Sequence, residues 1–296
     1  MHNFGISDCI GGTPLIEAGG IAHGEVKLYL KAEWFNPSGS IKDRTASYII
    51  AGAMERGELS RGGRVVEASS GNLGISLGML GVIYGLDVTI VMPEGMSRAR
   101  SGLMEKYGVR TVCTAAKDGM AGAVAEAERI AGEVGAFYPR QFENPDGVRA
   151  HYEGTAVEIT DALGGVPDAI IVGVGTGGTL MGIARRFAEV CPCEIIAVEP
   201  RESPVLSMGH AGRHGIAGIG AGFVPPLLDR SYIDRVVTVG DEEAMQVFDA
   251  LPRRIGLCCG ISSAAAVAAA IKLSLEEKYR GRRIVAILPD GVDRYI

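Results

Sequence analysis

The segment Asn36-Pro37-Ser38-Gly39-Ser40-Ile41-Lys42-Asp43-Arg44 places a lysine in the first turn of a helix predicted over residues 40–56. A turn of small residues precedes that helix. The N-terminal end of a helix carries positive partial charge, so an ammonium group there is unfavourable. Lys42 is therefore either an ordinary surface lysine on a solvated turn or a group with a chemical role. One such role is an imine with an aldehyde cofactor, because imine formation requires a neutral amine.

Strand and helix patterns alternate along the rest of the chain, in two series separated by Asn144-Pro145-Asp146-Gly147. The first series predicts strands at 26–31, 64–68, 87–92 and 109–113, and helices at 40–56, 72–84, 97–107 and 120–134. The second predicts strands at 169–174, 194–198, 236–239 and 283–288, and helices at 148–163, from 179 and at 262–279. Continuous apolar strands that alternate with helices indicate parallel sheets covered on both faces. We therefore predict an α/β fold of two domains, each an open, mostly parallel twisted sheet flanked by helices, with a cleft between them.

Composition excludes several classes of protein. The chain has 296 residues, 47% of them hydrophobic and 22% charged, with a net charge of -6 and no basic run, so we expect neither nucleic-acid nor membrane-surface binding. Its six cysteines form no C-x-x-C pair, which favours reduced thiols over a zinc site or disulfide framework. No signal peptide is recognised, and no apolar run approaches the ~20 residues that span a bilayer. The cysteine pattern fits reduced thiols in a cytoplasm, and no metal site is expected.

Ser69-Ser70-Gly71-Asn72-Leu73-Gly74 follows a predicted strand and opens a helix. Backbone N–H groups at such a helix start, together with serine and asparagine side chains, suit a carboxylate. An ordinary helix cap is the alternative interpretation. Two serines, a glycine and an asparagine together are more than one cap requires.

Gly173-Val174-Gly175-Thr176-Gly177-Gly178-Thr179 also follows a predicted strand and opens a helix. Its glycines allow amides to approach a phosphate, which the helix N-terminus stabilises. The same glycines match G-x-G-x-x-G, and Glu199 stands near the place of a ribose-binding acid. A nicotinamide cofactor and a purely structural turn therefore remain alternatives for this loop.

Two further segments lie where ligands bind in α/β folds. In Gly260-Ile261-Ser262-Ser263, Ser262 is either the N-cap of an Ala-rich buried helix or a hydroxyl that bonds a heteroatom of a bound ring. Leu288-Pro289-Asp290-Gly291 ends the last predicted strand, at the carboxyl edge where ligand sites gather. Trp34, the five histidines and the adjacent Cys258 and Cys259 are assigned no chemistry.

Together these segments resemble the cysteine synthase (O-acetylserine sulfhydrylase) branch of the fold-type II pyridoxal-phosphate enzymes, which are similar to the tryptophan synthase β chain. The resemblance extends over nearly the whole chain, from Gly11-Gly12-Thr13-Pro14-Leu15 to Leu288-Pro289-Asp290-Gly291-Val292-Asp293-Arg294-Tyr295. Between them it includes the lysine segment, 69–74, Met92-Pro93-Glu94-Gly95-Met96-Ser97, Gln141-Phe142-Glu143-Asn144-Pro145, 175–179, Gly218-Ile219-Gly220-Ala221-Gly222-Phe223-Val224-Pro225 and 260–263.

The resemblance implies a role for each matching residue. Lys42 would hold pyridoxal 5'-phosphate as an imine and then remove the substrate α-proton. The residues that would bind the rest of the cofactor are Asn72 at the ring hydroxyl, Ser262 at the pyridine nitrogen, and Gly175, Thr176, Gly177, Gly178 and Thr179 at the phosphate. Those that would bind the substrate are Ser69, Ser70, Gly71, Asn72 and Gln141 at the α-carboxylate, with Gly222 beside it.

The resemblance also implies the organisation and the reaction. Residues 35–143 would form a smaller mobile domain that binds the substrate carboxylate, and residues 9–34 plus 144–296 a larger domain that binds the phosphate and ring. The implied reaction is β-replacement, in which O-acetyl-L-serine and sulfide give L-cysteine through an aminoacrylate intermediate. A cytoplasmic homodimer is implied, with serine acetyltransferase as a further partner.

One departure from the family pattern bears on the substrate. Leu73 stands where the family usually has a threonine, whose hydroxyl helps to hold the carboxylate. Branches that use O-phosphoserine or serine, including diaminopropionate-forming and cystathionine β-synthase-like enzymes, therefore remain alternatives. The arginine of phosphoserine-using relatives is absent at Ala217, although Arg213 lies nearby. An NAD(P)-dependent oxidoreductase and a catalytically silent binding protein are the alternatives from other classes.

Overall fold

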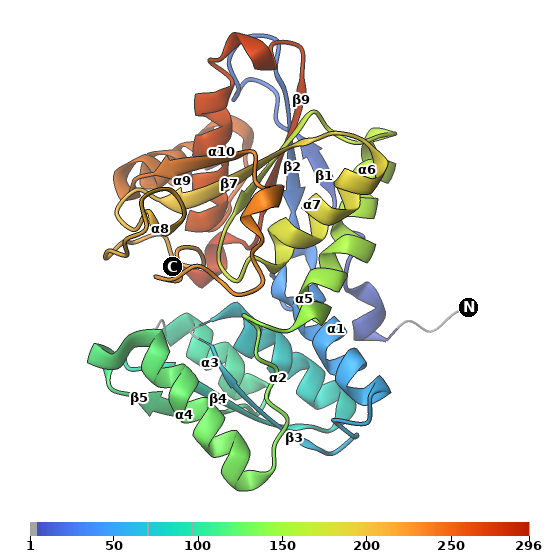
Figure 1. Cartoon of the computed structure of the whole chain (residues 1–296), viewed down its shortest axis with the longest axis vertical. Coiled ribbons are helices and arrows are strands. Elements are labelled where there is room, and N and C mark those ends of the chain that lie inside the picture. Colours follow the sequence, from blue (N-terminus) through green and yellow to red (C-terminus); the bar gives the residue numbers. More distant parts are fainter. Residues whose placement is uncertain (1–4, 70, 96–97, 296) are drawn as a thin grey trace.

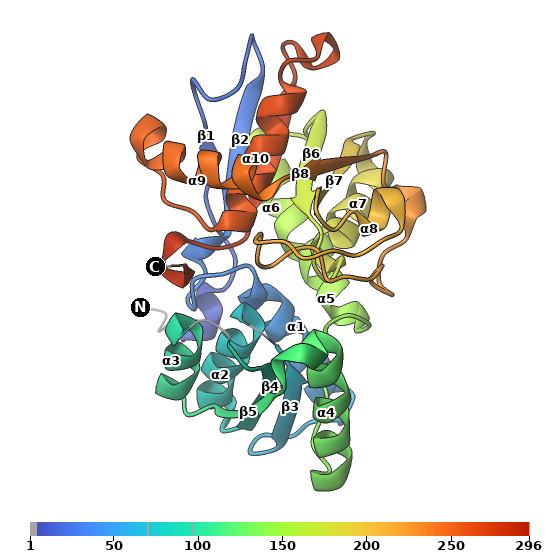
Figure 2. The same cartoon turned by 90° about the vertical axis from the view of Figure 1, so that its left-hand side faces the viewer.

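The computed structural model describes residues 5–69, 71–95 and 98–295 and contains two β-sheets with helices around them (Figures 1 and 2). The strands are β1 (Leu15–Glu17), β2 (Lys27–Ala32), β3 (Arg64–Ala68), β4 (Asp87–Pro93), β5 (Arg110–Thr114), β6 (Ala169–Gly173), β7 (Glu194–Pro200), β8 (Arg235–Val239) and β9 (Arg283–Leu288). The α-helices are α1 (Lys42–Glu55), α2 (Asn72–Tyr84), α3 (Arg98–Lys106), α4 (Gly119–Val134), α5 (Pro145–Ala150), α6 (Ala156–Leu163), α7 (Gly178–Val190), α8 (Val205–Met208), α9 (Asp241–Ile255) and α10 (Ile261–Leu273). The predicted α/β class with two mostly parallel sheets is confirmed.

The smaller sheet, in the lower part of Figure 1, has the strand order β3-β4-β5 and is parallel throughout. Side chains alternate across it because successive residues of a strand point to opposite faces. Val65 packs on the side of α1, α2 and α3, whereas its neighbour Val66 packs on the side of α4. Both faces are therefore buried, which explains why the strands have near-continuous apolar sequences.

The larger sheet has the order β1-β2-β9-β6-β7-β8, and all its pairs are parallel except β1 with β2. One face packs against α9 and the Ala-rich α10. The other face packs against α5, α6 and α7. Neighbouring residues again divide between the faces, since Ile171 belongs to the first cluster and Ile170 to the second. In the described residues, no helix is long and apolar enough to cross a membrane.

The structure differs from the predicted elements in five places. Strand β1 and helices α8 and α9 were not predicted. Helix α9 has three acidic residues in its first turn and two arginines in its last, which is the charge pattern typical of a helix. Pro252 lies within it, however, and a proline argues against a helix in prediction from sequence. The helix predicted over 262–279 ends at Leu273, and a 3-10 turn, η6 (Glu277–Tyr279), follows. The helix predicted over 148–163 is divided by a π-helical turn, η4 (His151–Thr155).

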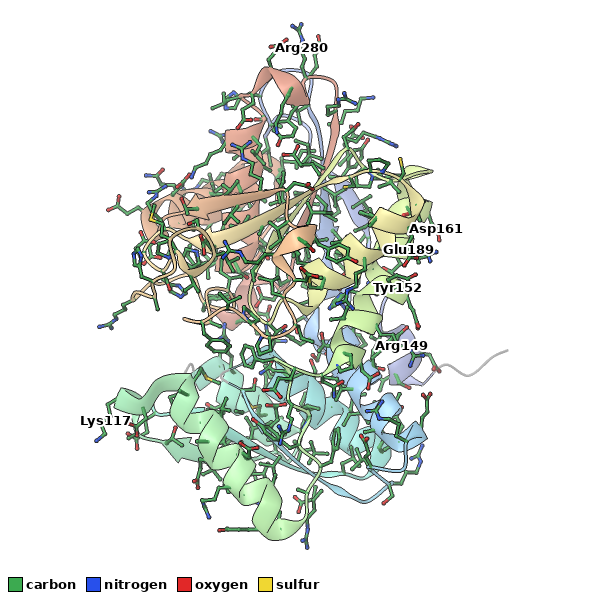
Figure 3. All side chains as sticks on the ribbon, viewed as in Figure 1. Lys117, Arg149, Tyr152, Asp161, Glu189 and Arg280 are labelled. Carbon is green, nitrogen blue, oxygen red and sulfur yellow. The ribbon has the colours of Figure 1, made fainter. Side chains whose placement is uncertain are left out.

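The π-helical turn packs against α7, and side chains on their outer surface interact (Figure 3). Tyr152 donates a hydrogen bond from its hydroxyl to Glu189, and Arg186 lies over the same ring at 5.3 Å. π-helical turns occur frequently at functional sites because they displace a side chain from its usual helical position. Here the turn directs His151 toward the protein interior, where the side chain is fully buried.

Candidate active site

A cavity of about 260 Å³ lies between the two sheets. Its walls come from the start of α1, from the loops after β3, β6 and β9, and from the glycine-rich segment around residue 220. The predicted site residues that line it are Lys42, Ser69, Gly71, Asn72, Gln141, Gly175, Thr176, Gly177, Thr179 and Ser262. Gly178 and Gly222 adjoin lining residues without lining the cavity themselves, and Ser70 lies outside the described residues.

Lys42 is fixed by its neighbours on both sides. Asp43 accepts hydrogen bonds from the Ser38 amide at 2.7 Å and the Ser76 hydroxyl at 2.6 Å, which ties the start of α1 to α2. On the other side, the Ile41 amide donates to the Pro289 carbonyl at 2.8 Å. Gly39 has a φ of 88°, so the turn before the lysine requires the conformational freedom of glycine.

Burial sets the charge state of the lysine. Loss of solvent lowers the pKa of Lys42 to about 8, and the carboxylate of Glu67 opposes this shift. Burial likewise raises the pKa of Glu67, which is 1% exposed, while N–H groups of Ala68 and Gln141 stabilise its charge. A substantial fraction of neutral Lys42 amine is therefore present near pH 8, as imine chemistry and proton abstraction require.

A largely buried network of charges holds α1 against the larger sheet. Arg44 pairs with Glu33 at 2.7 Å and with Glu158 at 2.6 Å, and Lys31 also pairs with Glu158 at 2.6 Å. Burial alone would raise the pKa of Glu158, but hydrogen bonds and charge from Arg44 and Lys31 lower it to about 2. Since Arg44 follows Lys42 by two residues, the network fixes the helix turn that carries the lysine.

The glycine-rich loop 173–179 forms a cradle at the start of α7. The first-turn N–H groups of that helix have no partner within the helix and carry positive partial charge, which suits a phosphate. The Gly178 amide donates to the Thr176 hydroxyl at 3.4 Å. The Thr179 hydroxyl lies 3.2 Å from Nε2 of the buried His151, whose Nδ1 lies 2.9 Å from the Thr155 hydroxyl. Burial and the charges of Arg44 and Lys42 lower the pKa of His151 well below its usual value, so the ring is neutral.

The loop after β3 presents donors on the opposite wall. The Ser69 hydroxyl oxygen accepts from the amides of Gly71 at 3.3 Å and Gly74 at 3.2 Å, which leaves its proton available to a ligand. The N–H groups of Asn72 and Leu73 lie in the first turn of α2 and have no partner within the helix. Gln141 is held beside them because its side-chain amide donates to the Ala68 carbonyl at 3.0 Å. This wall can bind a carboxylate.

Polar residues that sequence analysis did not assign complete the cavity. Asp290 accepts from Asn72 Nδ2 at 2.7 Å and from the Tyr295 hydroxyl at 3.0 Å. Burial raises the pKa of Asp290, and the bonds from Asn72 and Tyr295 oppose the rise. The position of Asp290 directly after the last strand predicted that it lies at the carboxyl edge of the sheet, where ligand sites gather. Arg100 gave no such signal, because it lies within a predicted helix.

Glu199 does not face the cavity. Its carboxylate accepts hydrogen bonds from the Leu206 amide at 2.6 Å, the Ser207 amide at 2.9 Å and the Ser207 hydroxyl at 2.6 Å. The residue is 2% exposed, so it stabilises the start of the short helix α8 and cannot bind a ribose. The interpretation of the glycine-rich loop as a nicotinamide site is therefore wrong.

The residues present fit a pyridine aldehyde that carries a phosphate. A buried amine, a phosphate cradle and a neutral hydroxyl on Ser262 surround one cavity, and the buried Oδ1 of Asn72 has no hydrogen-bond partner among the described residues. In agreement, the model of the family described as pyridoxal-phosphate dependent enzyme matches residues 6–290. The chain belongs to the pyridoxal-phosphate dependent enzyme family, which confirms the predicted cofactor.

Particular members of the family resemble the chain closely. A cysteine synthase from Staphylococcus aureus is 38% identical over 294 residues, which are 98% of this chain and 94% of the relative. The solved cysteine synthase of Entamoeba histolytica has a TM-score of 0.95 and 37% identity, covering 100% of this chain and 89% of its own. The O-acetylserine dependent cystathionine beta-synthase of Helicobacter pylori has a TM-score of 0.93 and 33% identity, covering 100% of this chain and 98% of its own. The resemblance found in the sequence is confirmed.

Proposed function

We propose that this protein is a cysteine synthase, which replaces the acetoxy group of O-acetyl-L-serine by sulfide to give L-cysteine. The observation that carries the proposal is the meeting of three groups in one cavity. These are the buried Lys42 amine, the phosphate cradle before α7 and the carboxylate-binding wall before α2. The relatives named above support the choice of cysteine synthase within the family.

Different residues would bind the cofactor phosphate, bind its ring and transfer the substrate proton. When bound, pyridoxal phosphate supplies an aldehyde that condenses with amines and a ring that withdraws electrons from the substrate α-carbon. Thr176, Gly177 and Thr179 would hold the phosphate, and Asn72 and Ser262 would hold the ring. The Lys42 amine would take the proton from the α-carbon, since its lowered pKa leaves it able to accept and release a proton near neutral pH.

Ser262 favours elimination of a β substituent over other outcomes. It is 2% exposed, and its hydroxyl is neutral. A carboxylate beside a pyridine nitrogen would keep that nitrogen protonated and the ring strongly electron-withdrawing, whereas a hydroxyl favours a neutral ring. Less negative charge then accumulates on the ring, which favours loss of a β leaving group.

Water must be excluded while the leaving group is replaced, because it competes with sulfide. Phe142 and Phe223 both line the cavity, with ring centroids 5.2 Å apart, and they come from opposite sides of it. We propose that residues 35–143 form a smaller domain that closes over the substrate and separates it from solvent. Residues 9–34 and 144–296 would form the fixed, larger domain.

The remaining assignments follow from the sequence resemblance alone. We propose a cytoplasmic homodimer with the six free thiols reduced, and serine acetyltransferase as a partner. Size-exclusion chromatography with light scattering, with and without serine acetyltransferase, tests both associations. A monomer, or no complex with the transferase, would contradict the corresponding assignment.

The decisive experiment compares substrates. The purified holoenzyme is given O-acetyl-L-serine, O-phospho-L-serine or L-serine with sulfide, and cysteine is measured; parallel reactions use homocysteine and measure cystathionine. We expect cysteine from O-acetyl-L-serine and sulfide at the highest kcat/KM. If the enzyme reacted only with O-phospho-L-serine or only with L-serine, or if it clearly preferred homocysteine to sulfide, it would catalyse a different β-replacement from the one proposed. The Lys42→Ala variant is the control for enzyme-independent reaction.

A further inference from the structure

Arg100, in α3, is a buried cation that lines the active-site cavity. The residue is only 9% exposed, and its buried Nε has no hydrogen-bond partner among the described residues. Its guanidinium lies over the Tyr295 ring, 5.2 Å from the centroid. A buried charge without a partner of opposite sign is strongly unfavourable. A buried guanidinium with an unpartnered Nε is therefore suited to bind an anion in the cavity.

The position of Gly71 shows where that anion binds. A Cβ atom on Gly71 would lie 2.9 Å from Arg100 Nη1, which is closer than carbon and nitrogen can approach. The guanidinium therefore lies directly against the loop after β3. That loop supplies the Ser69 hydroxyl and the first-turn amides of α2, so the cation and the anion-binding wall belong to one subsite.

Asp290 is near enough for the charge of Arg100 to oppose the rise in its pKa, but the two side chains form no ion pair in the described residues. It is the buried carboxylate on the same side of the cavity, but its oxygens accept from Asn72 and the Tyr295 hydroxyl. The Tyr295 ring contacts the guanidinium, and no ion pair of Arg100 with an acidic side chain is found in the described part of the chain. The unpartnered Nε of Arg100 therefore remains available to donate to an oxyanion.

We propose that Arg100 binds the α-carboxylate of the amino-acid substrate. The inference rests on the proposed function, because it assigns the substrate's carboxylate to this wall. It also offers a reason why the loop functions with Leu73, which is 1% exposed and brings no hydroxyl to the carboxylate. A bidentate guanidinium replaces the hydrogen bond that a threonine would donate.

The test compares L-serine with L-serine methyl ester, which lacks the negative charge but keeps the amine and the side chain. Each is titrated into the holoenzyme, and the dissociation constant is read from the change in cofactor absorbance. For Arg100→Met, we expect the dissociation constant for L-serine to rise about 10- to 100-fold, the range for losing a charged hydrogen bond. The constant for the ester should change by less than about 2-fold, since it makes no charged contact with Arg100.

Two further variants separate binding from structure. Arg100→Lys keeps the charge but loses the fork, so serine should bind with intermediate affinity. Arg110→Met removes an exposed guanidinium that pairs with Asp87 on the surface, and should leave both constants unchanged. Unfolding midpoints and cofactor absorbance of the free variants verify that each is folded and loaded.

Two results of these titrations would contradict the inference. Equal loss of serine and ester binding in Arg100→Met would mean that Arg100 only supports the fold of the cavity. No loss of either would mean that the carboxylate is bound without it. A wild-type protein that binds serine but forms no cysteine would defeat the proposed function and leave this comparison valid, whereas no response to serine or ester would defeat both.

Discussion

Asn72 donates a hydrogen bond from Nδ2 to Asp290 Oδ2 at 2.7 Å, and this bond joins the loop after β3 of one sheet to the loop after β9 of the other. The two residues are 218 positions apart in the chain. Because an ionised Asp290 accepts only, it orients the Asn72 amide so that Nδ2 points toward the carboxylate. The second hydrogen on Nδ2 and the unpartnered Oδ1 then remain for the cofactor ring.

Asp290→Ala should therefore weaken cofactor binding. Loss of the acceptor frees the Asn72 amide to rotate, and we expect the dissociation constant of pyridoxal phosphate from the apoprotein to rise about 10-fold. Fluorescence titration of the apoprotein measures it. Ser263→Ala is the matched control, because the Ser263 hydroxyl donates to the backbone carbonyl of Asp290, at 3.2 Å, and not to its carboxylate. Equal affinities of Asp290→Ala and wild type would show that the bond does not orient Asn72.

The Lys42 amine of the apoprotein should titrate near pH 8. Burial lowers its pKa to about 8, so the reactive neutral form increases as the pH rises through that value. Pulse labelling with an amine-reactive acylating reagent, followed by mass spectrometry of the Lys42 peptide, measures the profile. A labelling rate that continued to rise steeply toward pH 10, near the ordinary lysine value of about 10.4, would contradict the burial argument.

Lys42→Ala should lose nearly all turnover. General acid–base catalysis alone contributes roughly 10²- to 10⁴-fold, and the same amine also holds the cofactor, so a loss of at least about 10³-fold is expected. The initial rate of cysteine formation measures it. Lys117, on the surface near α4 (Figure 3), gives the control Lys117→Ala, which should retain the wild-type rate. If Lys42→Ala retained more than about one tenth of the wild-type rate, Lys42 would not have the catalytic role assigned to it.

Thr179→Val should reduce phosphate affinity without unfolding the protein. Valine has nearly the shape of threonine but lacks the hydroxyl that lies 3.2 Å from His151 Nε2. A lost hydrogen bond to a charged group corresponds to about 10- to 100-fold weaker binding of pyridoxal phosphate. Titration with pyridoxal, which lacks the phosphate, serves as the comparison. If both compounds lost affinity equally, the threonine would act on the fold of the loop and not on the phosphate.

Glu158→Gln should destabilise the fold, and the effect should depend on pH. Glu158 balances Arg44 and Lys31, which are nearly fully buried, so its loss should cost about 3 kcal/mol in the free energy of unfolding. The carboxylate has its pKa lowered to about 2 in the folded state, so the stabilisation is complete above the ordinary value near 4.5 and declines as the pH falls toward 2. Urea unfolding of both proteins at several pH values measures the difference. A difference that stayed constant between pH 6 and about 3 would contradict the assignment of the charge to Glu158.

The sequence was most informative where local pattern and chemistry coincide. Strand β9 was predicted with its observed bounds, since a continuous apolar run between charged and turn residues leaves little choice of limits. The lysine segment and the loops before α2 and α7 were identified because each carries its own helix-start signal. Helix α9 was missed because Pro252 breaks the pattern on which helix prediction depends, although its amphipathic face still packs on the larger sheet.

By itself, the sequence determined the parallel α/β class and located Lys42 and the loops before α2 and α7 as site candidates, because each depends on residues close together in the chain. Only the tertiary structure decided which remote side chains complete the cavity. Arg100 comes from within a helix and Asp290 from the end of the last strand, and neither position predicts its neighbours. Packing of the two sheets brings them to Gly71 and Asn72, and burial there sets their charge interactions. The charge state of Lys42 is likewise a property of the folded protein, since only burial lowers its pKa.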